Sequence, residues 1–303
     1  MRDDETAGPF RSGFVCFVGR PNVGKSTLTN ALVGQKIAIT SNRPQTTRHT
    51  VRGIVHRSDA QLVLVDTPGL HRPRTLLGER LNDVVLGTLT EVDVIGVCLP
   101  ADERAGPGDR FIMERLREVA DTPVVAVVTK TDLVDHRREL PRRLLEVGEQ
   151  AQFADVVPVS ATSGAQIDVL AGVLAGLLPE GRPLYPDGEL TDEPEQVLVA
   201  ELVREAVLED VRDELPHSIA VTVEEMSRRD GRDLVDVYAT VYVERSSQKA
   251  IVIGRQGARL RDVGGRARRQ IESLLGSSVY LDLHVKVLKD WQRDPRQLHR
   301  LGF

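Results

Sequence analysis

The chain has 303 residues, of which 41% are hydrophobic and 28% are charged, as in a globular protein with enough apolar residues to fill two cores. Its formal net charge of -5 argues against a protein that is basic over its whole surface. The start, MRDDETAGPFRSG, is acidic where a signal peptide is basic, and the longest apolar runs, VVAVV and VIGVCL, are too short to span a bilayer. We therefore expect an intracellular, cytoplasmic protein.

Short β-branched runs alternate with helical stretches in the first 180 residues, which predicts an α/β domain with a mostly parallel sheet between helices. The expected strands cover 14–19, 51–56, 61–66, 92–99, 122–129 and 154–160, and the clearest helices cover 25–34 and 109–120. Cys16 and Cys98 both lie inside such apolar runs, so we expect two buried free thiols. Phosphate-handling loops should follow the carboxyl ends of the strands.

The pattern changes after LPEGRPLYPDGELTDEP, whose Pro and Gly content is typical of a linker. An acidic helix is expected over 193–215, followed by alternating strands over 219–225, 234–243 and 279–287. Apolar residues recur every three or four positions between the last two strands, which predicts an amphipathic helix with its arginines off the apolar stripe: Leu260, Val263, Ala267, Ile271 and Leu274, against Arg259, Arg266, Arg268 and Arg269. This half reads as a small α+β unit.

The stretch GRPNVGKST, residues 19 to 27, fits the pattern G-x-x-x-x-G-K-[ST] and lies between an expected strand and an expected helix. Its glycines let backbone N–H groups wrap phosphates, Lys25 reaches the β and γ oxygens, and the Ser26 hydroxyl binds Mg²⁺. A glycine-rich turn that merely begins a helix is the competing interpretation, and the flanking elements disfavour it.

DTPG follows the strand QLVLVD, so Asp66 can hold the Mg²⁺ shell while the Gly69 N–H meets the γ-phosphate. The next residue is Leu70, where many nucleotide hydrolases keep a glutamine that orients the attacking water, and a leucine cannot do this. Between the two motifs lies SNRPQTTRH, from which Thr46 or Thr47 should close on Mg²⁺ when the third phosphate is present. We favour Thr47.

TKTD (129–132) and SAT (160–162) follow two further strands, where guanine-binding P-loop proteins carry N-K-x-D and S-A-x. The Asp132 carboxylate can accept from the guanine N1 and exocyclic amine, which adenine cannot imitate, so it predicts GTP as the nucleotide. Thr129 replaces the usual asparagine and keeps one hydroxyl in place of a carboxamide.

Charge is unevenly distributed in the second half of the chain. Residues 189–214 hold ten Asp and Glu against two Arg, whereas 249–300 hold twelve Lys and Arg against five Asp and Glu. Such a run is most often a solvated face, but here it surrounds Gly254-Arg255-Gln256-Gly257, a G-x-x-G that directly precedes the basic helix. KH domains clamp about four single-stranded nucleotides with such a loop.

Together these stretches resemble the Era family of bacterial GTPases, in which a G domain is joined to a KH RNA-binding domain. The resemblance rests on GRPNVGKST, QTTRH, DTPGL, TKTD and SAT, followed by PHSIAV, QKAIVIGRQGARL and WQRDPRQLHRLGF, and it covers nearly the whole chain. Thr129 and His284 depart from it, the latter standing where many members carry tryptophan. The resemblance implies an α/β P-loop GTPase domain (11–180) after a tail (1–10), then a linker (181–193) and a smaller α+β type II KH domain with a C-terminal tail (194–303).

The resemblance also implies details that residue patterns alone leave open. Propensity favours a strand for residues 250–253, but the KH loop joins two helices, so we expect helix there. GTPases of this kind place a hydrophobic residue after DxxG, and in related enzymes a P-loop asparagine helps to hold K⁺ beside the phosphates. Asn22 occupies the matching position, and Arg20 and Arg48 are rival sources of positive charge. Mg²⁺ and K⁺ are thus the expected cofactors.

The candidate site residues fall into four groups. Catalytic roles are expected for Asn22, Lys25, Thr47 and Gly69, and metal ligation for Ser26, Thr47 and Asp66. The nucleotide is expected to be bound by Gly19, Arg20, Pro21, Asn22, Val23, Gly24, Lys25, Ser26, Thr27, Asp66, Thr67, Pro68, Gly69, Thr129, Lys130, Asp132, Ser160 and Ala161. RNA is expected to be bound by Lys249, Gly254, Arg255, Gln256, Gly257 and Arg259.

The function implied is that of a GTP-hydrolysing, RNA-binding switch that binds the 3′ end region of 16S rRNA and acts in maturation of the small (30S) ribosomal subunit. No DNA partner is expected. A rival hypothesis is a nucleotide-gated regulatory protein, bound to RNA or to the inner face of the cell membrane, whose slow hydrolysis is incidental. An RNA-modifying enzyme is disfavoured because the sequence holds no further catalytic constellation.

Overall fold

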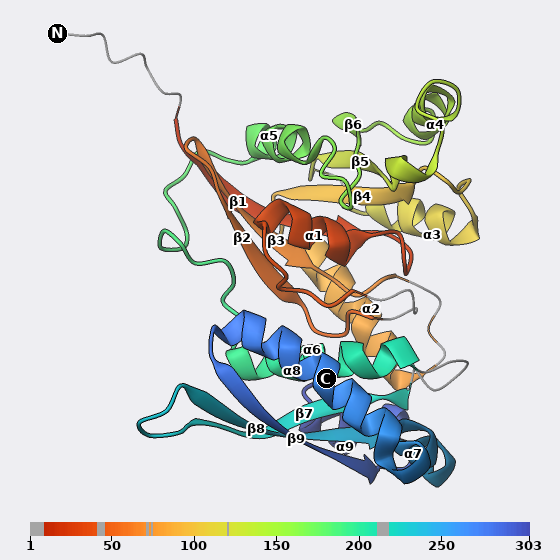
Figure 1. Cartoon of the computed structure of the whole chain (residues 1–303). Coiled ribbons are helices and arrows are strands. Elements are labelled where there is room, and N and C mark those ends of the chain that lie inside the picture. Colours follow the sequence, from red (N-terminus) through yellow and green to blue (C-terminus); the bar gives the residue numbers. More distant parts are fainter. Residues whose placement is uncertain (1–8, 41–45, 71–72, 74, 120, 211–217) are drawn as a thin grey trace, which may run out of the picture. The chain divides into compact units, whose positions relative to one another are not determined.

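The structure is a computed structural model that describes residues 9–40, 46–70, 73, 75–119, 121–210 and 218–303. Most of the expected N-terminal tail, part of the SNRPQTTRH loop and the end of the helix expected over 193–215 therefore lie outside the described residues. The chain divides into two compact units (Figure 1). The first comprises Met1–Ala38, Thr47–Arg72 and Leu81–Asp192, and the second comprises Ile39–Thr46, Pro73–Arg80 and Glu193–Phe303.

The first unit is a six-stranded sheet in the order β2-β3-β1-β4-β5-β6, parallel except for the β2/β3 pair. Its strands are β1 (Arg11–Val18), β2 (Val51–His56), β3 (Ala60–Asp66), β4 (Val94–Pro100), β5 (Val124–Thr129) and β6 (Asp155–Pro158). Its helices are α1 (Lys25–Val33), α3 (Pro107–Leu116), α4 (Glu139–Gly148), α5 (Ile167–Leu177) and the greater part of α2 (Leu76–Leu89). The expected α/β fold class and all six expected strands are confirmed.

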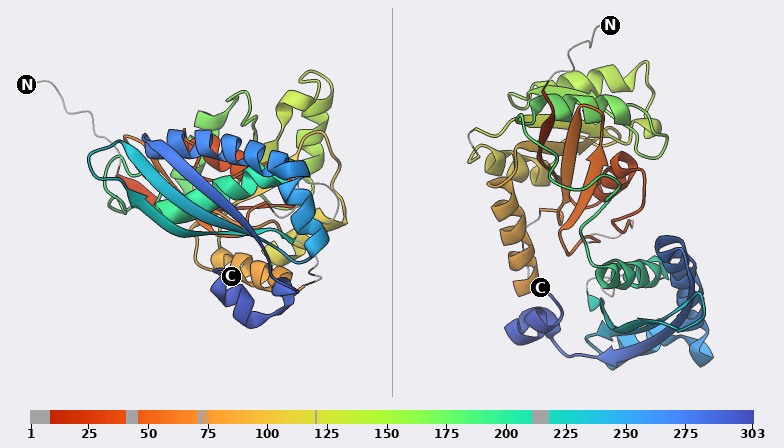
Figure 2. Two further views of the ribbon diagram at one scale, coloured as in Figure 1. Left: turned by 60° about the horizontal axis from the view of Figure 1, so that its bottom comes forward. Right: turned by 90° about the vertical axis from the view of Figure 1, so that its left-hand side faces the viewer.

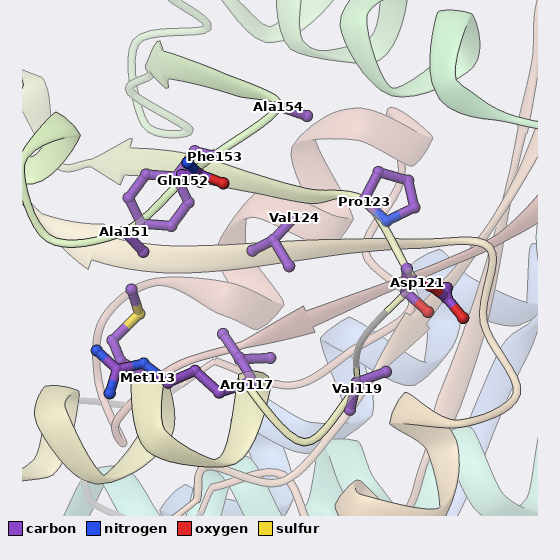
Figure 3. A pocket seen from close by; sticks show the side chains of 12 residues that line it. Met113, Arg117, Val119, Asp121, Pro123, Val124, Ala151, Gln152, Phe153 and Ala154 are labelled. Carbon is purple, nitrogen blue, oxygen red and sulfur yellow. The ribbon is translucent and has the colours of Figure 1, made fainter.

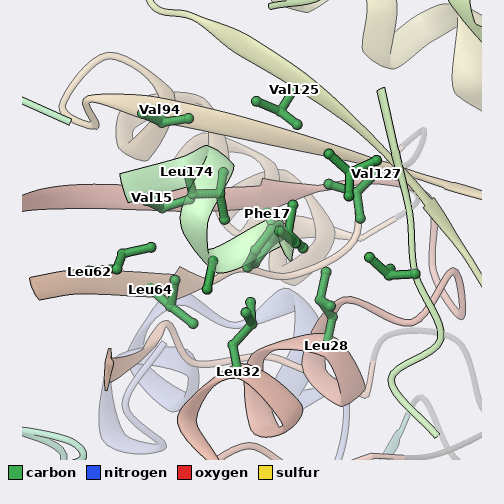
Figure 4. Close-up of a cluster of buried hydrophobic side chains, with 14 of the residues drawn as sticks. Val15, Phe17, Leu28, Leu32, Leu62, Leu64, Val94, Val125, Val127 and Leu174 are labelled. Carbon is green, nitrogen blue, oxygen red and sulfur yellow. The ribbon is translucent and has the colours of Figure 1, made fainter. Parts of the chain in front are cut away.

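Both faces of this sheet are covered by helices, because its central strands are apolar on both sides. In β1, Val15 and Phe17 point to the cluster built with α1 and α5, whereas Cys16 and Val18 point to the cluster built with α2, α3 and α4. Figure 4 shows the first cluster, where side chains of β1, β3, α1 and α5 meet. The layering brings the carboxyl ends of β1, β3, β5 and β6 to one edge, from which the candidate nucleotide motifs follow.

The structure corrects one expectation in this unit, the end of a helix, and confirms another, the state of the two cysteines. The helix expected to reach residue 120 ends at Leu116, because the N–H groups of Glu118 and Val119 turn to the carbonyls three residues earlier. Cys16 and Cys98 are confirmed as buried free thiols, and burial raises the pKa of each to about 12.

Much of the expected linker is attached to the first unit by hydrogen bonds. Gln61 Oε1 accepts from the backbone N–H of Leu184 at 2.6 Å, and the Ile54 N–H donates to the carbonyl of Leu190 at 2.9 Å. The division between the units falls at Asp192 and Glu193, directly before α6.

The second unit has a three-stranded sheet, β7-β8-β9, in which β7/β8 is antiparallel and β8/β9 parallel. Its principal elements are α6 (Glu195–Asp210), β7 (Ala220–Arg228), β8 (Leu234–Val243), α7 (Ser246–Ile253), α8 (Ala258–Leu275), β9 (Ser278–Val287) and α9 (Pro295–Arg300). Helices α6 and α8 lie side by side on one face of this sheet (Figure 2), over an apolar cluster drawn from both helices and all three strands. Residues 250–253 are helical in α7, as the resemblance implied and propensity did not.

Candidate functional site

The loop between β1 and α1 holds the first motif, and its backbone depends on glycine. Gly24 has φ 99°, a left-handed conformation that L side chains rarely adopt. A Cβ on Gly19 would lie 2.9 Å from the carbonyl oxygen of Cys98, so a side chain has no room there. Helix α1 begins at Lys25, and its first N–H groups therefore surround a site that suits an anion.

Lys25 lies across this loop with only 6% of its surface exposed. Its Nζ donates to the carbonyl oxygens of Gly19 and Arg20, both at 3.1 Å. Burial lowers the pKa of Lys25 below its ordinary value, and the nearby Asp66 carboxylate works in the opposite direction. The loop thus holds a cationic side chain by weak acceptors, which phosphate oxygens can replace.

Three oxygen-bearing side chains from different segments converge beside Lys25. Ser26 Oγ donates to Asp66 Oδ2 at 2.7 Å, and Thr47 Oγ1 lies 2.8 Å from Ser26 Oγ and 3.3 Å from Asp66 Oδ2. Burial raises the pKa of Asp66 to about 6. Its other oxygen, Oδ1, is buried and has no hydrogen-bond partner among the described residues. Hydroxyl and carboxylate oxygens with one unsatisfied acceptor fit a hard divalent cation such as Mg²⁺.

The structure separates Thr46 from Thr47. The hydroxyl of Thr47 joins the oxygen cluster, whereas the backbone carbonyl of Thr46 accepts a hydrogen bond from Arg204. Of the two candidates, Thr46 and Thr47, it is therefore Thr47 whose hydroxyl reaches the candidate metal site.

Arg20 was expected among the nucleotide-binding residues and as a rival source of positive charge. Its Nε donates to Asp109 Oδ1 at 2.8 Å, and its Nη2 pairs with Glu103 Oε2 at 2.9 Å. The guanidinium is thus neutralised by two carboxylates, and the part of Arg20 that belongs to the loop is its carbonyl, bound to Lys25. No motif in the sequence pointed to Asp109 or Glu103 as its partners.

Residues 66 to 70 approach the same loop from β3. A Cβ on Gly69 would lie 2.9 Å from the backbone nitrogen of Pro21, so this glycine permits a close approach of two backbones. The Thr67 hydroxyl donates to the Phe17 carbonyl at 3.1 Å, and Pro68 is buried beside it. Leu70 is 2% exposed and packs in the cluster of α2 and the sheet. Leu70 is thus a core residue, and in this conformation its side chain cannot orient a water molecule.

The remaining members of the loop divide between core and surface. Val23 is buried in the α1 and α5 cluster, and Thr27 is half-buried in the first turn of α1. Asn22 is exposed and has φ 65°, a conformation that asparagine adopts more readily than most L residues. Its place at the rim of the loop is compatible with contact to a ligand.

The two base-recognition motifs meet at the carboxyl ends of β5 and β6. Ser160 Oγ donates to Asp132 Oδ1 at 2.6 Å, which orients an exposed carboxylate. Thr129 Oγ1 donates to the Val23 carbonyl at 2.7 Å and so joins this region to the phosphate loop. Because a hydroxyl has one proton, Thr129 cannot also donate to a base. Lys130, with φ 57°, and Ala161 are both half-buried at the same edge.

In the second unit, the G-x-x-G stretch is a tight turn between α7 and α8. Gly254 and Gly257 have φ 72° and 74°, and a Cβ on Gly254 would lie 2.8 Å from the Cβ of Arg259. The two residues between them, Arg255 and Gln256, are exposed. Glycine is thus required at the ends of the turn, while its centre presents a cation and an amide to solvent.

Two arginines of α8 hold this turn in place. Arg259 Nη1 donates to the Ile251 carbonyl at 2.7 Å, so this expected RNA ligand also has a structural role. Arg261 Nη1 donates to the Gln256 carbonyl at 2.9 Å, and sequence reasoning did not identify it. Lys249 is half-buried in α7. The spacing of an amphipathic helix gives no signal for the contact of Arg261 with the turn.

A pocket in the first unit lies at the opposite end of β5 from the TKTD motif (Figure 3). Its lining includes Met113, Arg117, Val124 and Phe153, from α3 and from the segments beside β5 and β6. None of the candidate site residues lines it. Among the described residues, no helix is both long and apolar enough to cross a membrane.

Comparison with known proteins agrees with this geometry. Residues 14–130 match the family model of the 50S ribosome-binding GTPase, and residues 214–292 match that of the KH domain. GTPase Era of Streptomyces coelicolor is 68% identical over 302 residues, covering 97% of this chain and 95% of that protein. GTPase Era of Mycolicibacterium smegmatis is 68% identical over 297 residues, covering 97% and 99%.

Two solved structures are similar over almost the whole chain. Era in complex with MgGDPNP and nucleotides 1506–1542 of 16S ribosomal RNA superposes with a TM-score of 0.93 at 36% identity, covering 97% of this chain and 99% of that one. Era from Aquifex aeolicus bound to GDP and AlF4⁻ gives a TM-score of 0.92 at 37% identity, with the same coverage. With its phosphate loop, its DTPG segment and its glycine-bounded KH turn, the chain belongs to the GTPase Era family.

Proposed function

We propose that the protein is a GTP-hydrolysing switch that binds the 3′ end region of 16S rRNA and acts in maturation of the small ribosomal subunit. The observation that carries the proposal is the presence, in one chain, of two features: an oxygen cluster of Ser26, Thr47 and Asp66 beside Lys25, and a KH turn whose central residues are exposed. A relative of the same fold binds MgGDPNP together with nucleotides 1506–1542 of 16S rRNA.

The phosphate loop supplies positive charge and fixed dipoles for hydrolysis. When GTP binds, the Lys25 ammonium donates to the β and γ oxygens of GTP in place of its two carbonyl acceptors. The negative charge of the transition state develops on these phosphate oxygens. The N–H groups at the start of α1 and at Gly69 surround the same oxygens. Mg²⁺, when bound, neutralises charge on the β and γ phosphates, and Ser26, Thr47 and Asp66 are the residues that would hold it.

Base selection is assigned to Asp132. Its carboxylate is oriented by Ser160 and accepts from the guanine N1 and exocyclic amine. Thr129 contributes a link to the phosphate loop, because its only proton is donated to Val23. RNA is bound in the second unit, where the exposed Arg255 and Gln256 meet the phosphates of a single strand and the turn's glycines allow its backbone to approach closely.

We further propose the domain boundaries 1–10 (tail), 11–180 (GTPase domain), 181–193 (linker) and 194–303 (KH domain with its tail), in a cytoplasmic protein. The start of α6 at Glu195 supports the last boundary. The rival function, a nucleotide-gated or membrane-surface regulator with incidental hydrolysis, predicts no effect of rRNA on turnover. A membrane-surface regulator of this kind would contact the inner face of the cell membrane.

An experiment on the KH turn distinguishes the two functions. An RNA with the sequence of the 16S 3′ end should change the GTP turnover of the wild-type protein. Replacing both exposed residues of the turn, Arg255→Asp with Gln256→Asp, should weaken binding of this RNA by about tenfold or more, because two carboxylates then face the phosphates. The RNA effect on turnover should be lost with it.

The matched control carries the same change in charge on the hairpin of β7 and β8. Arg232→Asp with Ser227→Asp alters two exposed residues outside the turn and should bind the RNA as the wild type does. Equal RNA affinity of the turn variant and the control would remove the turn from the interface. An unchanged turnover of the wild type on addition of RNA would favour the rival function.

Because Leu70 is buried in the core and cannot orient water, another group must supply part of the catalysis, and we propose that a K⁺ ion held with the help of Asn22 stabilises the charge at the phosphates. Turnover should then be about tenfold faster in KCl than in NaCl at equal ionic strength, since a coordination site distinguishes ions that screening treats alike. Asn22→Ala should abolish this difference. Equal wild-type rates in the two salts would exclude the cation and leave the RNA or a partner protein as the source of the missing group.

A further inference from the structure

Three charged side chains of α6 are buried, and the roles given above use none of them. Arg204 is 1% exposed, Glu205 is 2% exposed and Glu201 is 9% exposed. Buried charges are costly unless other groups compensate them. Glu201 pairs with Arg204, whereas Arg204 and Glu205 also bind residues of the segment Ile39–Thr46. The structure groups this segment with the second unit, although it stands between α1 and β2 in the sequence.

The beginning of this segment is held by apolar packing and by Glu205. Ile39 is buried in the cluster that α6 forms with the second sheet. The next residue, Thr40, donates its backbone N–H to Glu205 Oε1 at 2.7 Å and its hydroxyl to the same oxygen at 3.2 Å. Helix α6 therefore holds the backbone of the segment at a defined point.

The end of the segment is held by Arg204. Its Nη2 donates to the backbone carbonyl of Thr46. Glu201, one turn earlier on α6, fixes the guanidinium with two hydrogen bonds, from Nε to Oε1 at 2.8 Å and from Nη2 to Oε2 at 2.5 Å. A bidentate pair of this kind sets the plane of the arginine and so the direction of its remaining donors.

One peptide bond connects this contact to the candidate metal site. The carbonyl of Thr46 and the N–H of Thr47 belong to the same planar amide, so the hydrogen bond from Arg204 restricts the orientation of the backbone that leads into Thr47. The Thr47 hydroxyl in turn lies 2.8 Å from Ser26 Oγ. We propose that Arg204, oriented by Glu201, is a positioning residue for GTP hydrolysis that sets Thr47 at the Mg²⁺ site.

The inference rests on the proposed role of Thr47 as a metal ligand, and its test uses the full-length protein. Glu201→Met with Arg204→Met removes the donor to Thr46 without leaving an unpaired buried carboxylate, and replacement of a buried ion pair by apolar residues of similar size is often tolerated. Turnover of GTP should fall by about tenfold, and the Mg²⁺ concentration for half-maximal rate should rise. Affinity for GDP should not change, because Thr47 is expected to close on the metal only with the third phosphate.

Combination with Thr47→Ala distinguishes positioning from general destabilisation. If Arg204 acts through Thr47, the triple variant should hydrolyse GTP no more slowly than Thr47→Ala alone, whereas independent effects would multiply. Arg266→Gln is the matched control: this arginine of the second unit also pairs with carboxylates, those of Glu209 and Asp262, and donates to a backbone carbonyl, that of Ala206. Its turnover should equal that of the wild type.

Thermal unfolding of each variant shows whether it is folded at the assay temperature, and Arg204→Lys, which keeps the charge beside Glu201, provides a second variant. The lysine should restore part of the lost rate if it can still reach Thr46. A folded double methionine variant with wild-type rate and Mg²⁺ dependence would overturn the inference. If Thr47→Ala itself hydrolyses GTP normally, the assignment of the metal ligand fails instead, so the two failures can be told apart.

Discussion

Lys25→Ala should lower GTP turnover by about a hundredfold to a thousandfold, the loss typical of removing one group that stabilises transition-state charge. The Lys25 ammonium is buried in the phosphate loop, where it donates to the carbonyl oxygens of Gly19 and Arg20. Arg20, one of the rival sources of positive charge, should not replace it, because its guanidinium is bound to Asp109 and Glu103. Single-turnover hydrolysis of GTP at saturating Mg²⁺ measures the loss directly.

Two comparisons make this result specific. Lys36→Ala removes an exposed lysine shortly after α1 and should leave turnover unchanged. The Lys25 variant should still bind the 16S 3′-end RNA, because the KH turn belongs to the other unit. A Lys25 variant that hydrolyses GTP within about twofold of the wild type would contradict the assigned role, since such a difference is under 1 kcal/mol in barrier height.

The phosphate loop and the strands around it were predictable because local rules determine them. Alternating apolar residues give the strands, and glycines with a following Lys and Ser give a turn that can bind an anion at the start of a helix. The separation of Val15 and Phe17 from Cys16 and Val18 onto two faces follows from the period of a strand and from the helices expected on both sides.

Contacts between distant residues could not be predicted in this way. Arg20 was a rival source of positive charge by its place in the motif, yet its guanidinium binds Asp109, 89 positions later, and nothing in either local sequence indicates the pair. Residues 250–253 have the β-branched character of a strand, but packing of α7 within the second unit overrides that propensity. Only the family resemblance indicated the helix.

The acidic helix expected over 193–215 shows that sequence alone also does not predict which charged side chains of a helix are buried. A run of Asp and Glu predicts a solvated face, and Glu195 and Glu209 are indeed exposed. Glu201, Arg204 and Glu205 are instead buried: Arg204 and Glu205 bind residues that lie more than 150 positions earlier in the chain, and Glu201 binds Arg204. Composition gives the number of charges on a helix, but the packing partner decides which of them are removed from water.

Asp132→Asn should change the preferred nucleotide from GTP to xanthosine triphosphate. The change should be large, about a hundredfold or more in relative affinity, because a buried or oriented polar group that loses its partner strongly disfavours the wrong ligand. Base recognition depends on Asp132 to an unusual degree here, since the Thr129 hydroxyl donates to Val23 and so cannot donate to the base. Competition between the two nucleotides for the full-length protein measures the preference, and Asp168→Asn, an exposed aspartate on α5, serves as the matched control.

The contact with Ser160 explains why the asparagine should reverse the preference and not merely weaken binding. Ser160 Oγ donates to Oδ1 of Asp132, and the same donor would hold the amide oxygen of an asparagine in that position. The amide nitrogen then occupies the place of the second carboxylate oxygen, where it can donate to the O2 that xanthine carries instead of the guanine amine. Ser160→Ala added to the asparagine variant should therefore reduce its preference for xanthosine triphosphate, because the amide is free to turn. An asparagine variant that still prefers GTP by the wild-type margin would show that Asp132 does not contact the base, and the role of Ser160 as its orienting partner would fail with it.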